Sequence, residues 1–245
     1  MSKSLLEFKN LVTEFHTEGT TVKAVNDVSF TLNKGETVGI VGESGSGKSV
    51  TSLSAMRLIP NPPGIISGGE IIFHKKGGEK VDLLKCSEEE MRSYRGNDIA
   101  MIFQEPMTSL NPVFTCGDQV LEAIMLHQNL NKEDAKKLTV ELFEKVQLPD
   151  PERIFSTYPH QISGGQKQRV MIAMAMSCEP SVLIADEPTG NLDPALSAEI
   201  MTLFEAFNQV GVTVLVATHD LSLIARSRHR LMTLAAGQLM QAGVA

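Results

Sequence analysis

A glycine-rich segment between an apolar run and a helical pattern constrains the fold of this 245-residue chain most strongly. Residues 37–41 read Thr-Val-Gly-Ile-Val, a short run typical of a strand buried on both faces of a parallel sheet. Three glycines follow within residues 42–47, and a helical pattern then runs from residue 48 to about residue 58. A strand, a tight turn and a helix in this order form half of a strand–helix–strand unit. We therefore expect an α/β fold with a mostly parallel core sheet.

Other segments extend this pattern along the chain. Two runs within residues 5–32 alternate apolar and polar side chains, which predicts half-buried antiparallel strands. Further buried strands are expected at residues 99–103, 182–185 and 212–216. Apolar positions in residues 113–160 recur at helical spacing, so this stretch is expected to be a mostly helical insertion. Because apolar strands alternate with helices, the parallel sheet should be covered on both faces.

The glycine-rich segment also predicts a phosphate-binding loop, because residues 42–49 match the pattern G-x-x-x-x-G-K-[ST]. Its backbone N–H groups would turn inward on phosphate oxygens, and the helix N-terminus would add partial positive charge. Lys48 would reach the β- and γ-phosphates, and the Ser49 hydroxyl would bind Mg²⁺. An ordinary glycine-rich turn is the alternative, but the flanking strand and helix argue against it. The candidate nucleotide-binding residues here are Gly42, Glu43, Ser44, Gly45, Ser46, Gly47, Lys48, Ser49 and Val50.

Two acids, Asp186 and Glu187, follow the apolar run at residues 182–185. Carboxylates at the C-terminal edge of a parallel sheet lie where ligands bind in such folds. Asp186 suits a Mg²⁺ shell, and Glu187 suits the polarisation of an attacking water. Adjacent acids at a strand end also commonly begin a solvated turn. Because a phosphate-binding loop precedes it in the chain, the acid pair is better evidence of a nucleotide site than it would be alone.

A second helix start is predicted at residues 163–166. Ser163 is a natural N-cap, and Gly164 and Gly165 would allow an anion to approach the backbone closely. Gln166 completes the segment. By itself, Ser-Gly-Gly would be interpreted by default as an ordinary N-cap with a tight turn.

The phosphate loop, the segment 163–166 and the strand that ends in Asp186 and Glu187 occur in this order. Together they closely resemble the ATP-binding-cassette (ABC) family over nearly the whole chain. The resemblance implies a Mg²⁺-dependent ATPase with the P-loop NTPase cassette fold, in which an N-terminal antiparallel β-subdomain and a helical subdomain accompany the core sheet. We expect one domain over residues 1–245, divided into a β and phosphate-loop core at 1–112, a helical subdomain at about 113–178 and a C-terminal core at about 179–245.

The resemblance assigns further residues. Gln104 matches the Q-loop glutamine, which implies contacts to Mg²⁺ and water and coupling to a partner. Asp193, in the Gly-Asn-Leu-Asp segment that includes Asn191, matches the acid of the D-loop. His219 matches the switch histidine that contacts the γ-phosphate, although a lone histidine after a strand is more often structural. Phe15 is the candidate for stacking on adenine, with a half-buried strand aromatic as the alternative. The implied catalytic set is Glu187, His219, Lys48 and Gln104, and the implied metal set is Ser49, Gln104 and Asp186.

The same resemblance implies partners. The chain has one phosphate loop and one signature segment, so each ATP would lie between two cassettes, identical or homologous, with Ser163 and Gly165 acting in trans. Residues 113–160 would contact membrane permease or other membrane partner subunits. The cassette would therefore sit peripherally at the cytoplasmic face of the membrane.

Charge and composition narrow the alternatives. Lys and Arg number 22 and Asp and Glu number 29, a net charge of −7, which argues against a uniformly basic nucleic-acid binder. No apolar run approaches the roughly 18 residues that a membrane span needs, and no signal peptide is expected. The cysteines lack metal-site spacing and fit a reducing cytoplasm: Cys86, Cys116 and Cys178.

Two parts of the chain resemble different cassettes. Residues 1–189 resemble the ATP-binding subunits of dipeptide and oligopeptide importers; the segments that carry this are residues 24–30, 41–47, 103–112 and 158–161. Residues 190–235 resemble cassettes of cell-division and lipoprotein-release complexes. We expect peptide import, with a division- or release-type ATPase that drives a membrane partner without solute import as the alternative. A soluble DNA-repair or translation ATPase is a further alternative, which the net charge of −7 argues against. A binding module without catalysis is another, which the intact acids at residues 186 and 187 argue against.

Overall fold

The computed structural model describes residues 3–17, 19–104, 109–190, 192–220 and 229–244. Its described strands form two sheets. The smaller sheet is antiparallel, with the order β2-β1-β4-β5. Its strands are β1 (Ser4–Thr17), β2 (Thr20–Asn33), β4 (Gly64–His74) and β5 (Lys80–Asp82). This is the N-terminal antiparallel sheet that the sequence predicts, enlarged by a long β4 that pairs directly with β1.

The larger sheet has the order β10-β9-β3-β8-β7-β6. All neighbouring strands are parallel except β10, which pairs antiparallel with β9. Its strands are β3 (Thr37–Val41), β6 (Ile99–Ile102), β7 (Val182–Asp186), β8 (Thr213–Thr218), β9 (Arg230–Ala235) and β10 (Gln238–Val244). The predicted α/β class with a mostly parallel core sheet is confirmed.

Successive side chains of this sheet enter two different cores. In β7, Val182 and Ile184 join a core that faces the antiparallel sheet, while Leu183 and Ala185 join the core under the helices. The same alternation runs through β8, where all described residues are buried. Period-two alternation with apolar residues on both faces is what a doubly covered sheet requires.

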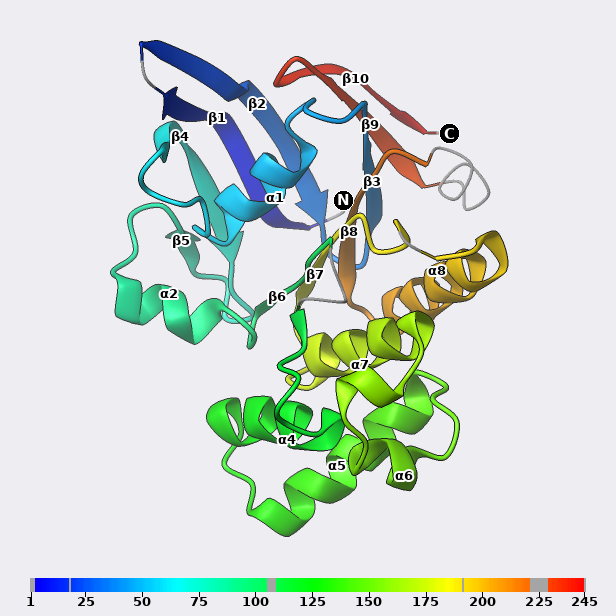
Figure 1. Cartoon of the computed structure of the whole chain (residues 1–245). Helices are drawn as coiled ribbons and strands as arrows, with labels where there is room; N and C mark the ends of the chain where they lie inside the picture. Colours follow the sequence, from blue (N-terminus) through cyan, green and yellow to red (C-terminus); the bar gives the residue numbers. More distant parts are fainter. Residues whose placement is uncertain (1–2, 18, 105–108, 191, 221–228, 245) are drawn as a thin grey trace.

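The helices form two groups around the sheets (Figure 1). The first flanks the two sheets and comprises α1 (Lys48–Ala55), α2 (Glu88–Tyr94) and α8 (Pro194–Gln209). The second lies at the opposite end of the molecule from β1 and β2 and comprises α4 (Cys116–His127), α5 (Lys132–Lys145), α6 (Pro151–Phe155), the 3₁₀ turn η1 (Pro159–Gln161) and α7 (Gly164–Met176). No described helix combines the length and the apolar character needed to cross a membrane.

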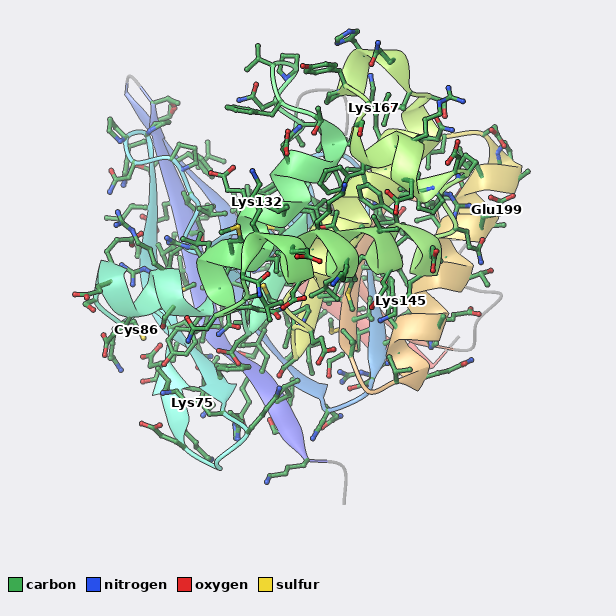
Figure 2. All side chains as sticks on the ribbon, turned by 90° about the horizontal axis from the view of Figure 1, so that it is seen from below. Lys75, Cys86, Lys132, Lys145, Lys167 and Glu199 are labelled. Carbon is green, nitrogen blue, oxygen red and sulfur yellow. The ribbon has the colours of Figure 1, made fainter. Side chains whose placement is uncertain are left out.

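Side-chain caps begin two helices of the second group. Thr115 caps α4 by accepting from the Asp118 amide, and Asn131 caps α5 by accepting from the Asp134 amide. Arg169 of α7 then joins this group to the core, since it donates to the Val146 carbonyl at 2.6 Å and to Glu199 of α8 at 2.5 Å. Figure 2 shows α5, with Lys132 and Lys145 at its ends, on the face that also carries Glu199.

Two expectations differ from the structure. The helix predicted to about residue 58 ends at Ala55, because Arg57 adopts a left-handed φ of 50° that ends the helical path. The sequence analysis also missed β10 and the turn at Ala236 and Gly237 that joins it to β9. Alternation in that stretch is too short to distinguish a hairpin from a loop.

A half-buried carboxylate on β1, that of Glu7, makes the stability of the fold depend on pH. The Ser4 hydroxyl donates to Glu7 at 2.8 Å, and Lys9 and His74 also contact this carboxylate. These contacts, the Ser4 hydrogen bond first, lower the pKa of Glu7 from 4.5 to about 2. Their stabilisation is therefore full above pH 4.5 and is lost as the pH falls towards about 2.

We predict that Glu7→Gln lowers the free energy of unfolding near pH 6 and that this deficit becomes steadily smaller as the pH falls towards about 2. Urea unfolding of both proteins between pH 2 and pH 6 measures the difference. Glu133→Gln is the control, because the Glu133 side chain on α5 is 81% exposed. A deficit for Glu7→Gln that did not change with pH would contradict the assignment.

Candidate functional site

The loop between β3 and α1 has the shape of an anion-binding turn. Its last residue, Gly47, is the N-cap of α1 with φ of 104°, a conformation that L side chains rarely adopt. A Cβ at Gly47 would also lie 2.5 Å from the Ala24 carbonyl oxygen of β2. Only glycine therefore lets the chain turn into the helix at this point with β2 packed against it.

Lys48, the first residue of α1, lies buried above this loop. Its ammonium donates to the carbonyl oxygens of Gly42 at 2.7 Å and Glu43 at 3.1 Å. It also lies 3.7 Å from Oε1 of Glu187, with both side chains more than 90% buried. A buried ammonium surrounded by oxygen atoms is well placed to exchange these partners for phosphate oxygens.

Ser49 and Asp186 meet across the base of the site. The Ser49 hydroxyl donates to Oδ1 of Asp186 at 3.0 Å, which joins α1 to the end of β7. Burial raises the pKa of Asp186, an effect reinforced by Glu187 and opposed by the Ser49 hydrogen bond and by Lys48. A hydroxyl and a carboxylate this close supply two hard oxygen donors, the type that Mg²⁺ prefers.

Glu187 is held by the neighbouring strand β8. Its amide donates to the Ala217 carbonyl at 2.7 Å, and its Oε2 lies 2.8 Å from Nδ1 of His219. The His219 amide also donates to Oε2 at 3.3 Å. Glu187 is buried, whereas the His219 side chain is 65% exposed. Glu187 has a φ of 47°, a strained conformation for a non-glycine residue and one that recurs at functional sites.

These elements surround a cavity of about 790 Å³, which is large enough for a nucleotide. It is lined by the whole segment 42–50 together with Gln104, Glu187 and His219. The sequence analysis missed Ala24, Val41 and Thr233, which also line the cavity. Nothing in the sequence marks them, because their positions follow from the packing of β2 and from the pairing of Val41 in β3 with Thr233 in β9.

The other predicted site residues lie outside this lining, within the described part of the chain. The Phe15 ring packs near Gly64 of β4, so adenine stacking by Phe15 stays a prediction. Ser163 accepts from the Gln166 amide and caps α7, while the Gln166 side chain accepts from the Ser163 amide. Asp193 caps α8 by accepting from two amides at 3.0 Å. Asn191 and residues 105–108 lie outside the described residues.

The N-termini of α7 and α8 pack together. A Cβ added at Gly165 would overlap the side chain of Leu196, so the first turns of the two helices are in close contact. Residues 163–166 and Asp193 therefore belong to one surface of this chain. The structure does not bring that surface into the lining of the cavity.

Comparison with known proteins identifies the family of this chain. The profile described as ABC transporter matches residues 25–190. The chain belongs to this family. The oligopeptide transport ATP-binding protein OppD of Bacillus subtilis is 48% identical over 240 residues, 98% of this chain and 66% of OppD. A Brucella ovis protein whose name assigns it provisionally as a peptide import ATP-binding protein is also 48% identical, over 98% of this chain and 71% of that protein.

Solved ABC structures agree with the fold. A dimeric bacterial ABC transporter cassette matches with a TM-score of 0.86 and 28% identity, over 98% of both chains. A dimeric cassette in a post-hydrolysis state, bound to ADP and Pi, matches with a TM-score of 0.85 and 27% identity. The resemblance to an ABC cassette is thus confirmed, and the fold is one that binds nucleotide.

The burial of Asp186 yields a stability prediction. Because its pKa is raised on folding, the ionised carboxylate costs stability above that pKa, and the cost vanishes at low pH where both states are protonated. Asp186→Asn should therefore stabilise the nucleotide-free ABC cassette near pH 7, with a gain that shrinks as the pH falls. Thermal unfolding at several pH values measures this. A variant that is less stable than the wild type at pH 7 would contradict this prediction.

Proposed function

We propose that this chain binds and hydrolyses Mg²⁺-ATP and so energises a membrane complex that imports dipeptides or oligopeptides. The observation that carries the proposal is that Lys48, Ser49, Glu187 and His219 line one cavity, with Asp186 hydrogen-bonded to Ser49 but outside the lining. These are the groups that phosphoryl transfer to water needs: a cation for the phosphates, oxygen donors for a metal and a base for the water.

In this proposal the phosphate chain of ATP lies along the loop. Its oxygens replace the carbonyls of Gly42 and Glu43 as partners of the Lys48 ammonium, and the α1 N-terminus adds partial positive charge. Lys48 then turns towards the phosphates, which loosens its contact with Glu187. ATP binding would thus release the carboxylate that acts next.

The residues present suit a Mg²⁺ ion that is bound partly by the protein and partly by the phosphates of ATP. The described residues include no cluster of three or more His, Cys, Asp or Glu side chains that could hold a metal alone. Mg²⁺ is usually bound by one or two carboxylates together with phosphate oxygens and water. Ser49 and Asp186 would hold it, together with Gln104, which follows β6 and lines the same cavity. When bound, Mg²⁺ supplies neutralisation of the phosphate charge.

Glu187 is the proposed general base. It is buried, lines the cavity and is oriented by His219 through both a ring nitrogen and the backbone amide. Its carboxylate would accept a proton from the water that attacks the γ-phosphate. His219 would hold Glu187 in place and contact the γ-phosphate with its exposed ring.

A second cassette completes the site in our proposal. The surface formed by residues 163–166 and Asp193 presents two helix N-termini side by side, a suitable partner for the phosphates bound by another copy or a homologue. Two of the solved cassettes that match this chain are dimeric. Ser163, Gly164, Gly165 and Gln166 would therefore act in trans.

Peptide import is the substrate class that the relatives favour. OppD, the Brucella protein and a glutathione import ATP-binding protein of Pectobacterium atrosepticum, 44% identical over 98% of this chain and 39% of that protein, are all import proteins by name. None of these three relatives is named as a cell-division or lipoprotein-release protein, so the proposal keeps peptide import over the division- or release-type alternative. No nucleic-acid partner is proposed.

The helical group is the proposed contact for the membrane subunits, at the cytoplasmic face of the membrane. Several large apolar side chains on or beside α4 and η1 are exposed: Val113, Phe114, Met125, Leu126 and Tyr158. We keep the division into residues 1–112, about 113–178 and about 179–245 as part of this proposal, with the middle part as the docking element.

Glu187→Gln tests the catalytic assignment. The amide keeps the size of the carboxylate but cannot accept the proton, so turnover should fall by about 100-fold or more. ATP binding should be retained, and an ATP-dependent dimer should accumulate. Phosphate release and size-exclusion chromatography measure both. Glu89→Gln, on the exposed face of α2, is the control. Near-normal hydrolysis would remove Glu187 from this role.

Uptake tests the import assignment. A strain that lacks this chain should lose accumulation of a radiolabelled di- or tripeptide, and the wild-type gene should restore it while the Glu187→Gln gene should not. Normal uptake in the deletion strain, with ATP hydrolysis by the purified chain intact, would leave an ATPase but contradict peptide import.

A further inference from the structure

The turn between β9 and β10 packs against the back of the phosphate loop. It consists of Ala236 and Gly237, which have φ values of 48° and 75°, as expected for a two-residue hairpin turn in which both residues are left-handed. The Gly237 amide donates to the Ser46 carbonyl at 3.0 Å. Gly237 is buried but does not line the cavity, whereas Ala236 is exposed.

The same turn is held from its other side by β2. The Asn26 amide donates to the Gly237 carbonyl at 2.7 Å. Backbone atoms of β2 also fill the space beside Gly237, because an added Cβ would lie 2.8 Å from the Ala24 oxygen and 3.1 Å from the Lys23 oxygen. Gly237 is thus fixed between β2 and the phosphate loop, with no space for a side chain.

The hydrogen bond to Ser46 has a consequence for the neighbouring amide. The Ser46 carbonyl and the Gly47 N–H belong to one planar trans peptide, so they point in opposite directions. A donor that holds the carbonyl towards the turn therefore directs the Gly47 N–H away from it, on the side of the cavity that Gly47 lines. That amide belongs to the N-cap residue of α1, where the free N–H groups of a helix favour an anion such as phosphate.

We infer that Gly237 is a positioning residue for the nucleotide site: the hairpin turn of β9 and β10 fixes the Ser46–Gly47 peptide and thereby sets the affinity of the phosphate loop for ATP. The inference rests on the proposed function, since it requires that the cavity binds ATP. It also assigns a role in nucleotide binding to a hairpin that contributes only Thr233 to the described cavity lining.

Gly237→Ala tests the inference in the full-length chain. The added methyl must push the turn away from the β2 backbone, which breaks the hydrogen bond from the Gly237 amide to the Ser46 carbonyl. The Ser46–Gly47 peptide is then no longer held in place. The Kd for ATP in the presence of Mg²⁺, from isothermal titration, should rise by about tenfold or more, the loss expected when one hydrogen bond to a charged group is weakened. The KM for ATP should rise with kcat changed by less than about twofold.

Two matched variants separate positioning from general strain. Gly35→Ala places alanine at a similar φ of 70° with no atom within 4 Å of the new methyl, so it carries the backbone strain alone. Gly78→Ala makes the same change at a φ of 88° between β4 and β5, again with no atom within 4 Å of the new methyl. Both should keep the wild-type Kd for ATP, while thermal unfolding reports the stability of each protein.

The outcomes distinguish the inference from the proposed function. If the wild type binds ATP and a folded Gly237→Ala binds it equally well, the inference is wrong and the proposed function stands. An equal loss of affinity in Gly35→Ala would also overturn it. No ATP binding by the wild type would contradict both.

If Gly237→Ala does not fold, amide hydrogen exchange of the wild-type protein tests the inference instead. Mg²⁺-ATP should slow exchange in peptides that contain Gly237 but not in those that contain Gly78, whose turn has no contact with the loop. Unchanged exchange at Gly237 would overturn the inference.

Discussion

The site depends on one backbone constraint, the turn by which β3 passes into α1 and over whose carbonyl oxygens the Lys48 ammonium is held. β3 lies inside the sheet, with β8 on one side and β9 on the other. The C-terminal ends of these parallel strands therefore surround the turn, as at ligand sites of other α/β sheets. That is why Asp186 and Glu187 after β7 and His219 after β8 meet Lys48 and Ser49, although they are distant in the sequence.

This arrangement concentrates charge where water is scarce. Lys48, Asp186 and Glu187 are each at least 94% buried, and Glu187 also adopts a strained backbone conformation. Buried ionised groups of this kind are costly unless they are paired, and they are typical of sites built for catalysis and not for stability. Two extensive apolar cores, one on each face of the sheet, hold the strands firmly enough to keep these groups in place.

Local patterns made most of this predictable. The loop at residues 42–49, the acids after β7 and the cap at Ser163 each depend on a few neighbouring residues, and the structure has the predicted strands and helices around them. Contacts between distant segments could not be predicted. Thr233 reaches the cavity because β9 pairs with β3, and Gly237 reaches the loop through an unpredicted hairpin. The sequence also cannot distinguish a base-stacking Phe15 from one packed near Gly64.

The most direct test of the account is to purify the tagged chain from gently solubilised native membranes and to identify its partners by mass spectrometry. The account predicts multi-span permease subunits, together with a second cassette that is a homologue or another copy of this chain. The helical group would be the part that binds the permeases. A complex with two copies of this chain and a single membrane protein that is no permease would contradict peptide import and favour a division- or release-type machine.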